Sequence, residues 1–235
     1  MPERWFSDEE LDEMTRPTMD VAIDAIDSGD SKTANELCER EKHESQFMHD
    51  MLVDGMAGLI SFVKEKLGDE GVREAWEWSL ERSWKQSVEK IDAADRKAIA
   101  QALAATWRAH SCSGVGPVPG AFQVSEDEEK LTFTMNPCGS GQRLWRNGRY
   151  GPDGWGVTDS AHDWSYGRED FPLYCTHCAF MNELGPINWI GYPVYPSEPP
   201  EDFDRDPCVW HWYKDPADIP ERHWKRYGRK RSLPG

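Results

Sequence analysis

The sequence lacks long apolar runs and has little positive charge. Its longest apolar stretch, residues 56–63, is far shorter than the ~20 residues of a membrane-spanning helix. The chain carries 27 Lys and Arg against 43 Asp and Glu, a formal charge of −16. Such a charge argues against nucleic acid or an anionic membrane surface as a partner. The N-terminal residues MPERWFSDEE lack the basic start and apolar segment of a secretory signal. We therefore expect a cytoplasmic protein.

The chain is poor in hydrophobic residues but rich in aromatic ones. Hydrophobic residues make up 38% and the mean hydropathy is −0.78, values that with this charge would favour disorder. Aromatic residues nevertheless make up 11%, including 12 tryptophans, and disordered chains are poor in them. The 235 residues are therefore expected to fold as one large or two small domains.

Residues 1–110 have the patterns of helices joined by short loops, which predicts a helical bundle. Ser7 and Glu10 match a capping box, and Pro17 suits the first turn of a helix that Gly29 ends. Two later helices are predicted. One spans about residues 69–90, and the other begins after an N-cap at Asp92. They place apolar residues at core spacing: Val72, Trp76, Leu80, Trp84, Ile99, Leu103 and Trp107.

A long helix is predicted over residues 31–67, with Gly68 as its stop. One face is apolar and is expected to be buried: Leu37, Met48, Met51, Leu52, Gly55, Leu59 and Phe62. The opposite stripe is polar and is expected to face solvent: Glu39, His43, Gln46, Asp50 and Asp54. Glu41 and His49 interrupt the apolar side. A buried Glu41–His49 pair could act as a general base or form an interdomain hydrogen-bond network. His110 is a third candidate for moving protons.

The pattern changes after residue 110, which is the predicted domain boundary. Residues 131–135 alternate between apolar and polar side chains, as a half-buried strand does, and residues 121–124 can pair with them through an acidic turn. From Pro137 onward Gly, Pro, Trp and Asp dominate. Long irregular segments need something besides an aliphatic core to hold them. The fold class expected is α+β: a helical domain over 1–110, then a zinc-stabilised, aromatic-rich domain over 111–235 with a small antiparallel sheet.

Four cysteines of this second half suggest a zinc site. Cys175 and Cys178 form a CxxC turn, and Cys138 and Cys208 lie far from it in sequence, beside turn-forming residues. Ala179 follows the second cysteine where a c-type haem needs histidine. The alternatives are a redox pair, four cysteines buried as small hydrophobes, and Cys138 as a nucleophile in CGSG, whose glycines leave backbone N–H groups open to an oxyanion.

The fourth zinc position decides whether the metal is structural or catalytic. Four thiolates make a closed site, whereas three ligands and a water make a reactive one. His177 could replace a cysteine, and His162 or His211 could be a ligand or a base beside the metal; the simpler interpretation of each is a surface histidine.

Two roles are open for the tryptophans and tyrosines of the second half: they pack in the hydrophobic core, or they line a pocket. An acidic, aromatic pocket suits a cationic or heteroaromatic small molecule. We expect a zinc-dependent enzyme for a small polar molecule, acting by hydrolysis or metal-assisted elimination. Zinc would be bound by Cys138, Cys175, Cys178 and Cys208, and protons moved by His49, Glu41 or His110. The alternative is a non-enzymatic binding or sensor module with a purely structural zinc.

Overall fold

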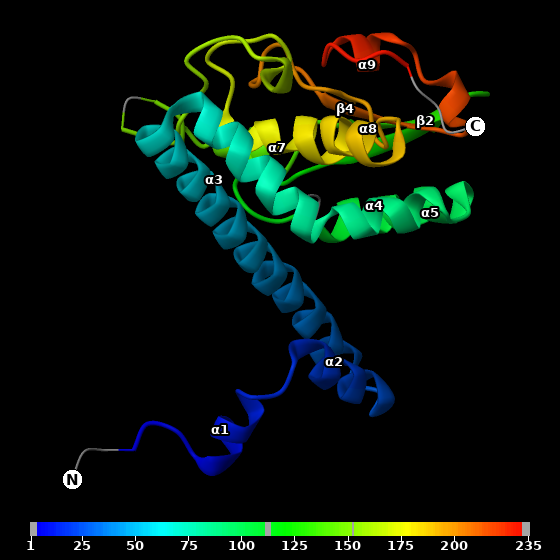
Figure 1. Cartoon of the computed structure of the whole chain (residues 1–235). Helices are drawn as coiled ribbons and strands as arrows, with labels where there is room; N and C mark the ends of the chain where they lie inside the picture. Colours follow the sequence, from blue (N-terminus) through cyan, green and yellow to red (C-terminus); the bar gives the residue numbers. More distant parts are fainter. Residues whose placement is uncertain (1–3, 111–113, 152, 232–235) are drawn as a thin grey trace. The chain divides into compact units, whose positions relative to one another are not determined.

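The computed structural model describes residues 4–110, 114–151 and 153–231 and confirms a mixture of helices with a small antiparallel sheet, the α+β class (Figure 1). The chain divides into two compact units, residues 1–48 and 49–235. Helices α4 and α5 therefore belong to the same unit as the sheet. Of the helices described, none combines the length and apolarity needed to cross a membrane.

The first unit contains α1 (Asp8–Glu13), α2 (Thr18–Asp27) and the beginning of α3 (Ser31–Ser83). The predicted capping box is confirmed: the Ser7 hydroxyl accepts from the Glu10 N–H at 3.2 Å, and the Glu10 carboxylate accepts from the Ser7 N–H at 2.7 Å. The Thr18 hydroxyl donates to the Glu44 carboxylate at 2.6 Å, which ties α2 to α3.

Helix α3 is interrupted at Gly68, where the sequence predicts the stop. Gly68 has φ +71° and ψ −172°, so the helical path breaks there and then resumes. A residue with a β-carbon adopts such a positive φ only with strain. The glycine therefore fixes the position of the break.

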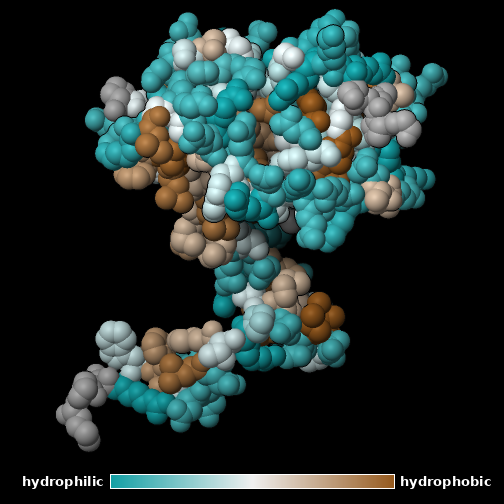
Figure 2. Space-filling view, in the orientation of Figure 1, coloured by the Kyte–Doolittle hydropathy of each residue, from teal (hydrophilic) through white to brown (hydrophobic). Residues whose placement is uncertain are grey.

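The predicted orientation of α3 is wrong. Leu52, Leu59 and Phe62, assigned to the buried face, are 64%, 71% and 56% exposed. Figure 2 shows such apolar side chains on the molecular surface. The buried residues are instead small or β-branched, or lie on the stripe expected to face solvent: Gln46, Val53, Ala57 and Ile60. The physical reason is that Asp50 and Asp54 pair with Arg143, an interaction that the helical pattern alone does not reveal.

Helices α4 (Lys85–Asp92) and α5 (Arg96–His110) follow α3. The predicted cap at Asp92 is wrong. The Asp95 carboxylate accepts from the backbone N–H of Lys97 at 2.8 Å, whereas Asp92 ends α4 and accepts a hydrogen bond from the Tyr192 hydroxyl.

The sheet has the order β1–β2–β4–β3, with every neighbouring pair antiparallel. Its strands are β1 (Phe122–Glu126), β2 (Lys130–Met135), β3 (Ser197–Glu198) and β4 (Cys208–Tyr213). The predicted hairpin is confirmed, since Phe122 pairs with Met135 and the acidic turn contains Asp127. Phe133 and Met135 are buried, as the alternation predicts.

Short elements join the strands and build the rest of the second unit. They are α6 (Gly141–Arg146), η1 (Asp163–Ser165), η2 (Leu173–Cys175), α7 (Thr176–Cys178), η3 (Ala179–Leu184), α8 (Gly185–Ile190), η4 (Pro216–Asp218) and α9 (Arg222–Lys225). Aromatic side chains make much of the core: Trp107 meets Trp210 edge to face, with ring centroids 4.4 Å apart. This contact packs α5 on the sheet and forms one wall of the candidate site.

Candidate functional site

The sheet brings Cys138 and Cys208 together. In the antiparallel pairing of β2 with β4, Cys208 lies opposite Met135, and Cys138 follows three residues later. Strand register therefore places in one region two cysteines that are far apart in sequence.

The CxxC segment approaches the same region from η2 and α7. Cys175 ends η2 and Cys178 ends α7, so one helical turn separates them. A β-carbon on Gly141 would lie 2.4 Å from the Cys175 sulfur. Glycine at position 141 therefore allows the loop after Cys138 to approach the CxxC segment.

All four predicted ligand cysteines line one cavity of about 320 Å³: Cys138, Cys175, Cys178 and Cys208. Its walls are largely aromatic and include Trp84, Trp107, Tyr174, Tyr195 and Trp210. Every lining residue belongs to the second unit. The structure thus brings together three separate chain segments that the sequence analysis could link only by residue type.

Burial controls the chemistry of these thiols. It raises the pKa of Cys175 and Cys178 well above the ordinary value, and the neighbouring cysteines raise it further. The pKa of Cys208 is raised for the same reasons. Such thiols are protonated at neutral pH and inert as nucleophiles unless a cation displaces the proton.

Over residues 4–110, 114–151 and 153–231, no group of three or more His, Cys, Asp or Glu side chains is arranged to hold a metal ion. The four thiols share the cavity without converging on one point. A zinc site at these cysteines therefore stays a prediction.

His177 lies between the two CxxC cysteines and also lines the cavity. Its Nδ1 is hydrogen-bonded to the Tyr174 carbonyl, and its Nε2 lies 3.5 Å from the Cys178 sulfur. Burial lowers the His177 pKa, so the neutral ring is favoured. Of the three alternative histidine ligands, only His177 is brought to the cysteines.

His49, the predicted general base, reaches the wall of the cavity through Ser140. Its Nε2 lies 2.9 Å from the Ser140 hydroxyl, and its Nδ1 lies 2.9 Å from the Asp50 carboxylate. Ser140 is 2% exposed and lines the cavity. Burial lowers the His49 pKa, which favours the neutral form that a general base needs.

Arg143 holds in place the carboxylates of Asp50, which pairs with His49, and of Asp54. Its Nε lies 3.0 Å from the Asp50 carboxylate, and its Nη2 lies 3.0 Å from that of Asp54. Arg143 is 5% exposed, so these charge-assisted contacts also satisfy a buried guanidinium. They hold α6, which begins beside Ser140, against α3.

Two residues that line the cavity carry buried polar atoms without a hydrogen-bond partner among the described residues. Within the described part of the chain, the Asn182 Oδ1 and the Tyr166 hydroxyl have no hydrogen-bond partner, and both residues line the cavity. Asn182 is fully buried. An unsatisfied buried acceptor costs about 1–3 kcal/mol, and a ligand that donates a hydrogen bond would relieve this cost if the Asn182 side chain turned its Oδ1 into the cavity.

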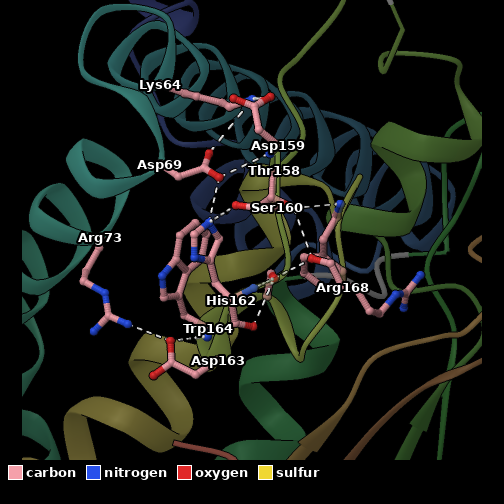
Figure 3. Close-up of polar contacts among 12 residues, drawn as sticks. Lys64, Asp69, Arg73, Thr158, Asp159, Ser160, His162, Asp163, Trp164 and Arg168 are labelled. Carbon is pink, nitrogen blue, oxygen red and sulfur yellow. Dashed lines mark hydrogen bonds and ion pairs between the residues drawn. The ribbon is translucent and has the colours of Figure 1, made fainter.

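His162 belongs to a different polar network (Figure 3). Its Nε2 lies 2.7 Å from the Asp69 carboxylate and 3.2 Å from the Ser160 hydroxyl. The ring is stacked on Trp164 at 4.4 Å. These contacts tie residues 158–165 to α3, and His162 does not line the cysteine cavity.

His211 also lies away from the cysteines. It follows Trp210, a cavity residue, so strand alternation directs it to the other face of the sheet. There its Nδ1 lies 3.2 Å from the Thr132 hydroxyl, and its Nε2 lies 3.6 Å from the Glu198 carboxylate. Its role is to pair strands.

Of the two other predicted proton-moving residues, Glu41 does not line the cavity. Glu41 lies in the first unit, where its carboxylate accepts a hydrogen bond from Ser45 at 3.1 Å. His110 ends α5, and its side chain lies outside the described residues.

Three members of the site do not follow from the sequence pattern: Ser140, Asp50 and Arg143. The helical pattern predicts a solvated Asp50, and CGSG predicts only a glycine-rich turn at Ser140. The one available signal is the serine between two glycines in CGSGQ, because glycines let the backbone approach other segments closely.

Neither protein-family models, curated proteins nor solved structures give a match to this chain. The residues and their geometry are therefore the basis for inferring a function.

Proposed function

We propose that the second unit is a zinc-containing enzyme that hydrolyses a small molecule in the cysteine cavity. Cys138, Cys175, Cys178 and Cys208 bind one zinc ion, which holds the cavity wall in place. The observation that carries the proposal is the meeting of these four cysteines, from three chain segments, at one cavity.

The chemistry of the cysteines supports zinc. Four thiolates match its tetrahedral preference, and zinc displaces thiol protons on binding. Burial and mutual proximity keep the thiols protonated without a cation. Zinc binding would require the side chains to turn inward and would exchange four buried thiols for four zinc-bound thiolates, whose negative charge the ion halves.

The remaining cavity suits a flat substrate with a polar end. Aromatic walls favour a planar or apolar group. A rotation of the Asn182 side chain would offer its unpartnered Oδ1 to a donor on the substrate. This substrate is less polar than the sequence suggests, because the charged side chains of the unit lie mainly outside the cavity wall.

Hydrolysis is favoured because His49 can move a proton at the cavity wall. Its hydrogen bond to Ser140 connects the imidazole with the cavity, and the Asp50 carboxylate lies at the other ring nitrogen. With four thiolates bound, zinc has no open position, so proton transfer is assigned to His49 rather than to a metal-bound water.

The test is the metal content of the purified full chain. Elemental analysis should find about one zinc per chain. Cys175→Ser or Cys208→Ser should reduce the zinc content by at least tenfold, since thiolate ligands contribute most of the ~10–16 kcal/mol of structural zinc binding. Cys38→Ser is the matched control, because Cys38 lies in the first unit and should leave the content unchanged. A folded chain free of metal would contradict the proposal.

A non-enzymatic module with a structural zinc is the second candidate. The observation that favours it is the closed set of four cysteines, which leaves the metal no reactive position. Such a module would bind a flat ligand in the cavity without turnover, and His49→Gln would leave that binding intact.

A further inference from the structure

Two consecutive residues of α3 and a serine 91 positions further along the chain form a continuous hydrogen-bonded series. The Asp50 carboxylate lies 2.9 Å from His49 Nδ1, and His49 Nε2 lies 2.9 Å from the Ser140 hydroxyl. Each ring nitrogen thus has its own partner. The order acid, imidazole, hydroxyl activates serine in enzymes of unrelated folds.

We propose that Ser140 is the nucleophile of an acyl-transfer reaction in which a carboxylic ester or thioester is hydrolysed. His49 acts as the general base, and Asp50 orients the imidazole. The proposal rests on the enzymatic part of the proposed function and does not require the zinc ion.

The reaction proceeds in two balanced steps. The Ser140 oxygen attacks the carbonyl carbon as its proton passes to His49 Nε2, and the alcohol or thiol leaves with that proton. Water then attacks the acyl-serine and gives a proton to His49, which returns it to Ser140 as the carboxylic acid is released. Water is the only co-reactant.

The surroundings of Ser140 suit this reaction. Ser140 lines the cavity between two glycines but is only 2% exposed, so a substrate would reach its hydroxyl by displacing neighbouring side chains. Tyr174 lies close to Ser140 and lines the same cavity, so its hydroxyl is the donor that we assign to the developing oxyanion. The aromatic walls provide room for a flat acyl group.

Arg143 gives the carboxylate a fixed position. Its Nε contacts the same Asp50 oxygen that faces His49, at 3.0 Å. This contact joins α6 to α3 and therefore holds the nucleophile and its base in register. A site positioned by two helices keeps the geometry that proton transfer needs.

The molecule contains a matched comparison in Ser160, His162 and Asp69. There the serine and the carboxylate both lie at the same nitrogen, His162 Nε2, at 3.2 and 2.7 Å (Figure 3). The carboxylate competes with the serine for that nitrogen and does not orient the ring from its other side. We therefore expect Ser160 to be unreactive.

The test is covalent labelling of the full chain with an alkyl fluorophosphonate, which traps activated serines. Intact mass should rise by one adduct per chain, and peptide mapping should place the adduct on Ser140. Ser140→Ala should abolish labelling, and Ser160→Ala should leave it unchanged. An adduct at any other serine, or no adduct on the folded chain, would overturn the proposal.

Two further measurements separate nucleophilic catalysis from a structural role. His49→Gln keeps a hydrogen-bonding side chain but should slow labelling and hydrolysis of p-nitrophenyl butyrate by at least about 100-fold, the contribution of a general base. Mapping of the wild-type adduct decides the assignment even if Ser140→Ala does not fold.

Zinc content measured on the same samples keeps the two proposals apart. Labelling at Ser140 without zinc contradicts only the metal site, and zinc without labelling contradicts only the nucleophile.

Discussion

Single residues decide how closely the cavity segments approach. Gly141 begins α6 with no β-carbon, and a β-carbon there would lie 2.4 Å from the Cys175 sulfur. The neighbouring cysteine cannot withdraw easily because it is held at the end of η2. A single methyl group at position 141 is therefore expected to push apart two of the segments that carry cysteines.

We predict that Gly141→Ala destabilises the chain by about 1–3 kcal/mol, the usual cost of overpacking a core. It should also weaken zinc retention, because Cys138 and Cys175 are displaced from one another. Urea denaturation and elemental analysis measure the two effects. Gly55→Ala is the control: nothing lies within 4 Å of its added β-carbon, and helix propensity favours alanine. Equal stability losses in both variants would contradict the prediction.

The Glu198–His211 contact makes a pH-dependent contribution to stability. Glu198 has a pKa lowered to about 2, chiefly by its hydrogen bond with His211 and also by Arg222. A carboxyl group with a lowered pKa in the folded state stabilises the fold above its unfolded pKa of about 4.3. That contribution is lost as the pH falls from there toward 2.

We therefore predict that Glu198→Gln lowers the melting temperature at pH 6 but has little effect near pH 2.5. The loss in free energy of unfolding at pH 6 should stay below about 1 kcal/mol, because the Glu198 side chain is 44% exposed and solvent screens the interaction. Glu201→Gln serves as the exposed control. The same loss at both pH values would show that the carboxylate charge is not the cause.

At the scale of elements, α3 illustrates how tertiary contacts select a helix face. Its most apolar stripe is exposed, and its buried side combines Val53, Ala57 and Ile60 with the carboxylates of Asp50 and Asp54. The side chains of the exposed apolar stripe are larger than those of the buried side, which are small enough to fit against α6 and Tyr174. Steric fit and the Arg143 ion pairs therefore outweigh the larger apolar area of the other face.

Neighbouring substitutions on α3 test this orientation. Ile60→Ala should cost about 2–4 kcal/mol, since Ile60 is 4% exposed within a core cluster. Leu59→Gln should change stability by less than about 0.5 kcal/mol, because Leu59 is 71% exposed. Chemical denaturation of the full chain measures both. If Leu59→Gln proved the more damaging substitution, the predicted buried face would be right after all.

At the scale of the whole molecule, the second unit depends on aromatic packing and on the cysteine cavity. Between Pro137 and Cys208 the described residues form short helices, four of which follow one another over residues 173–190, and the sheet contributes only the two residues of β3. Trp164, Trp212 and Trp224 are almost fully buried and supply much of the core area. The proposed zinc would join three of these segments.

We predict that removing the metal with a chelator lowers the melting temperature of the zinc-loaded chain by about 10 °C. Saturation at a thousandfold excess over Kd stabilises a protein by about 4 kcal/mol, and each kcal/mol shifts Tm by about 2–4 °C at this size. Differential scanning calorimetry with and without chelator measures the shift, and added zinc should reverse it. Cys175→Ser should melt at the same temperature under both conditions; a chelator effect that persists in this variant would point to a different metal site.

The sequence by itself determined the local structure. The capping box at Ser7, the break at Gly68 and the β1–β2 hairpin follow from side-chain hydrogen bonding, glycine conformation and alternation over a few residues. The cysteines were also recognised as a set, because few other residue types bind soft metals. Such features depend on interactions between near neighbours, which a sequence records directly.

The tertiary structure decided which distant residues meet. It placed Cys208 beside Cys138 through strand register, turned the polar side of α3 inward, and joined His49 to Ser140 across 91 positions. It also separated His162 and His211 from the cysteines. These outcomes depend on pairing and packing between segments far apart in sequence, where helical periodicity and residue type fit several arrangements equally well.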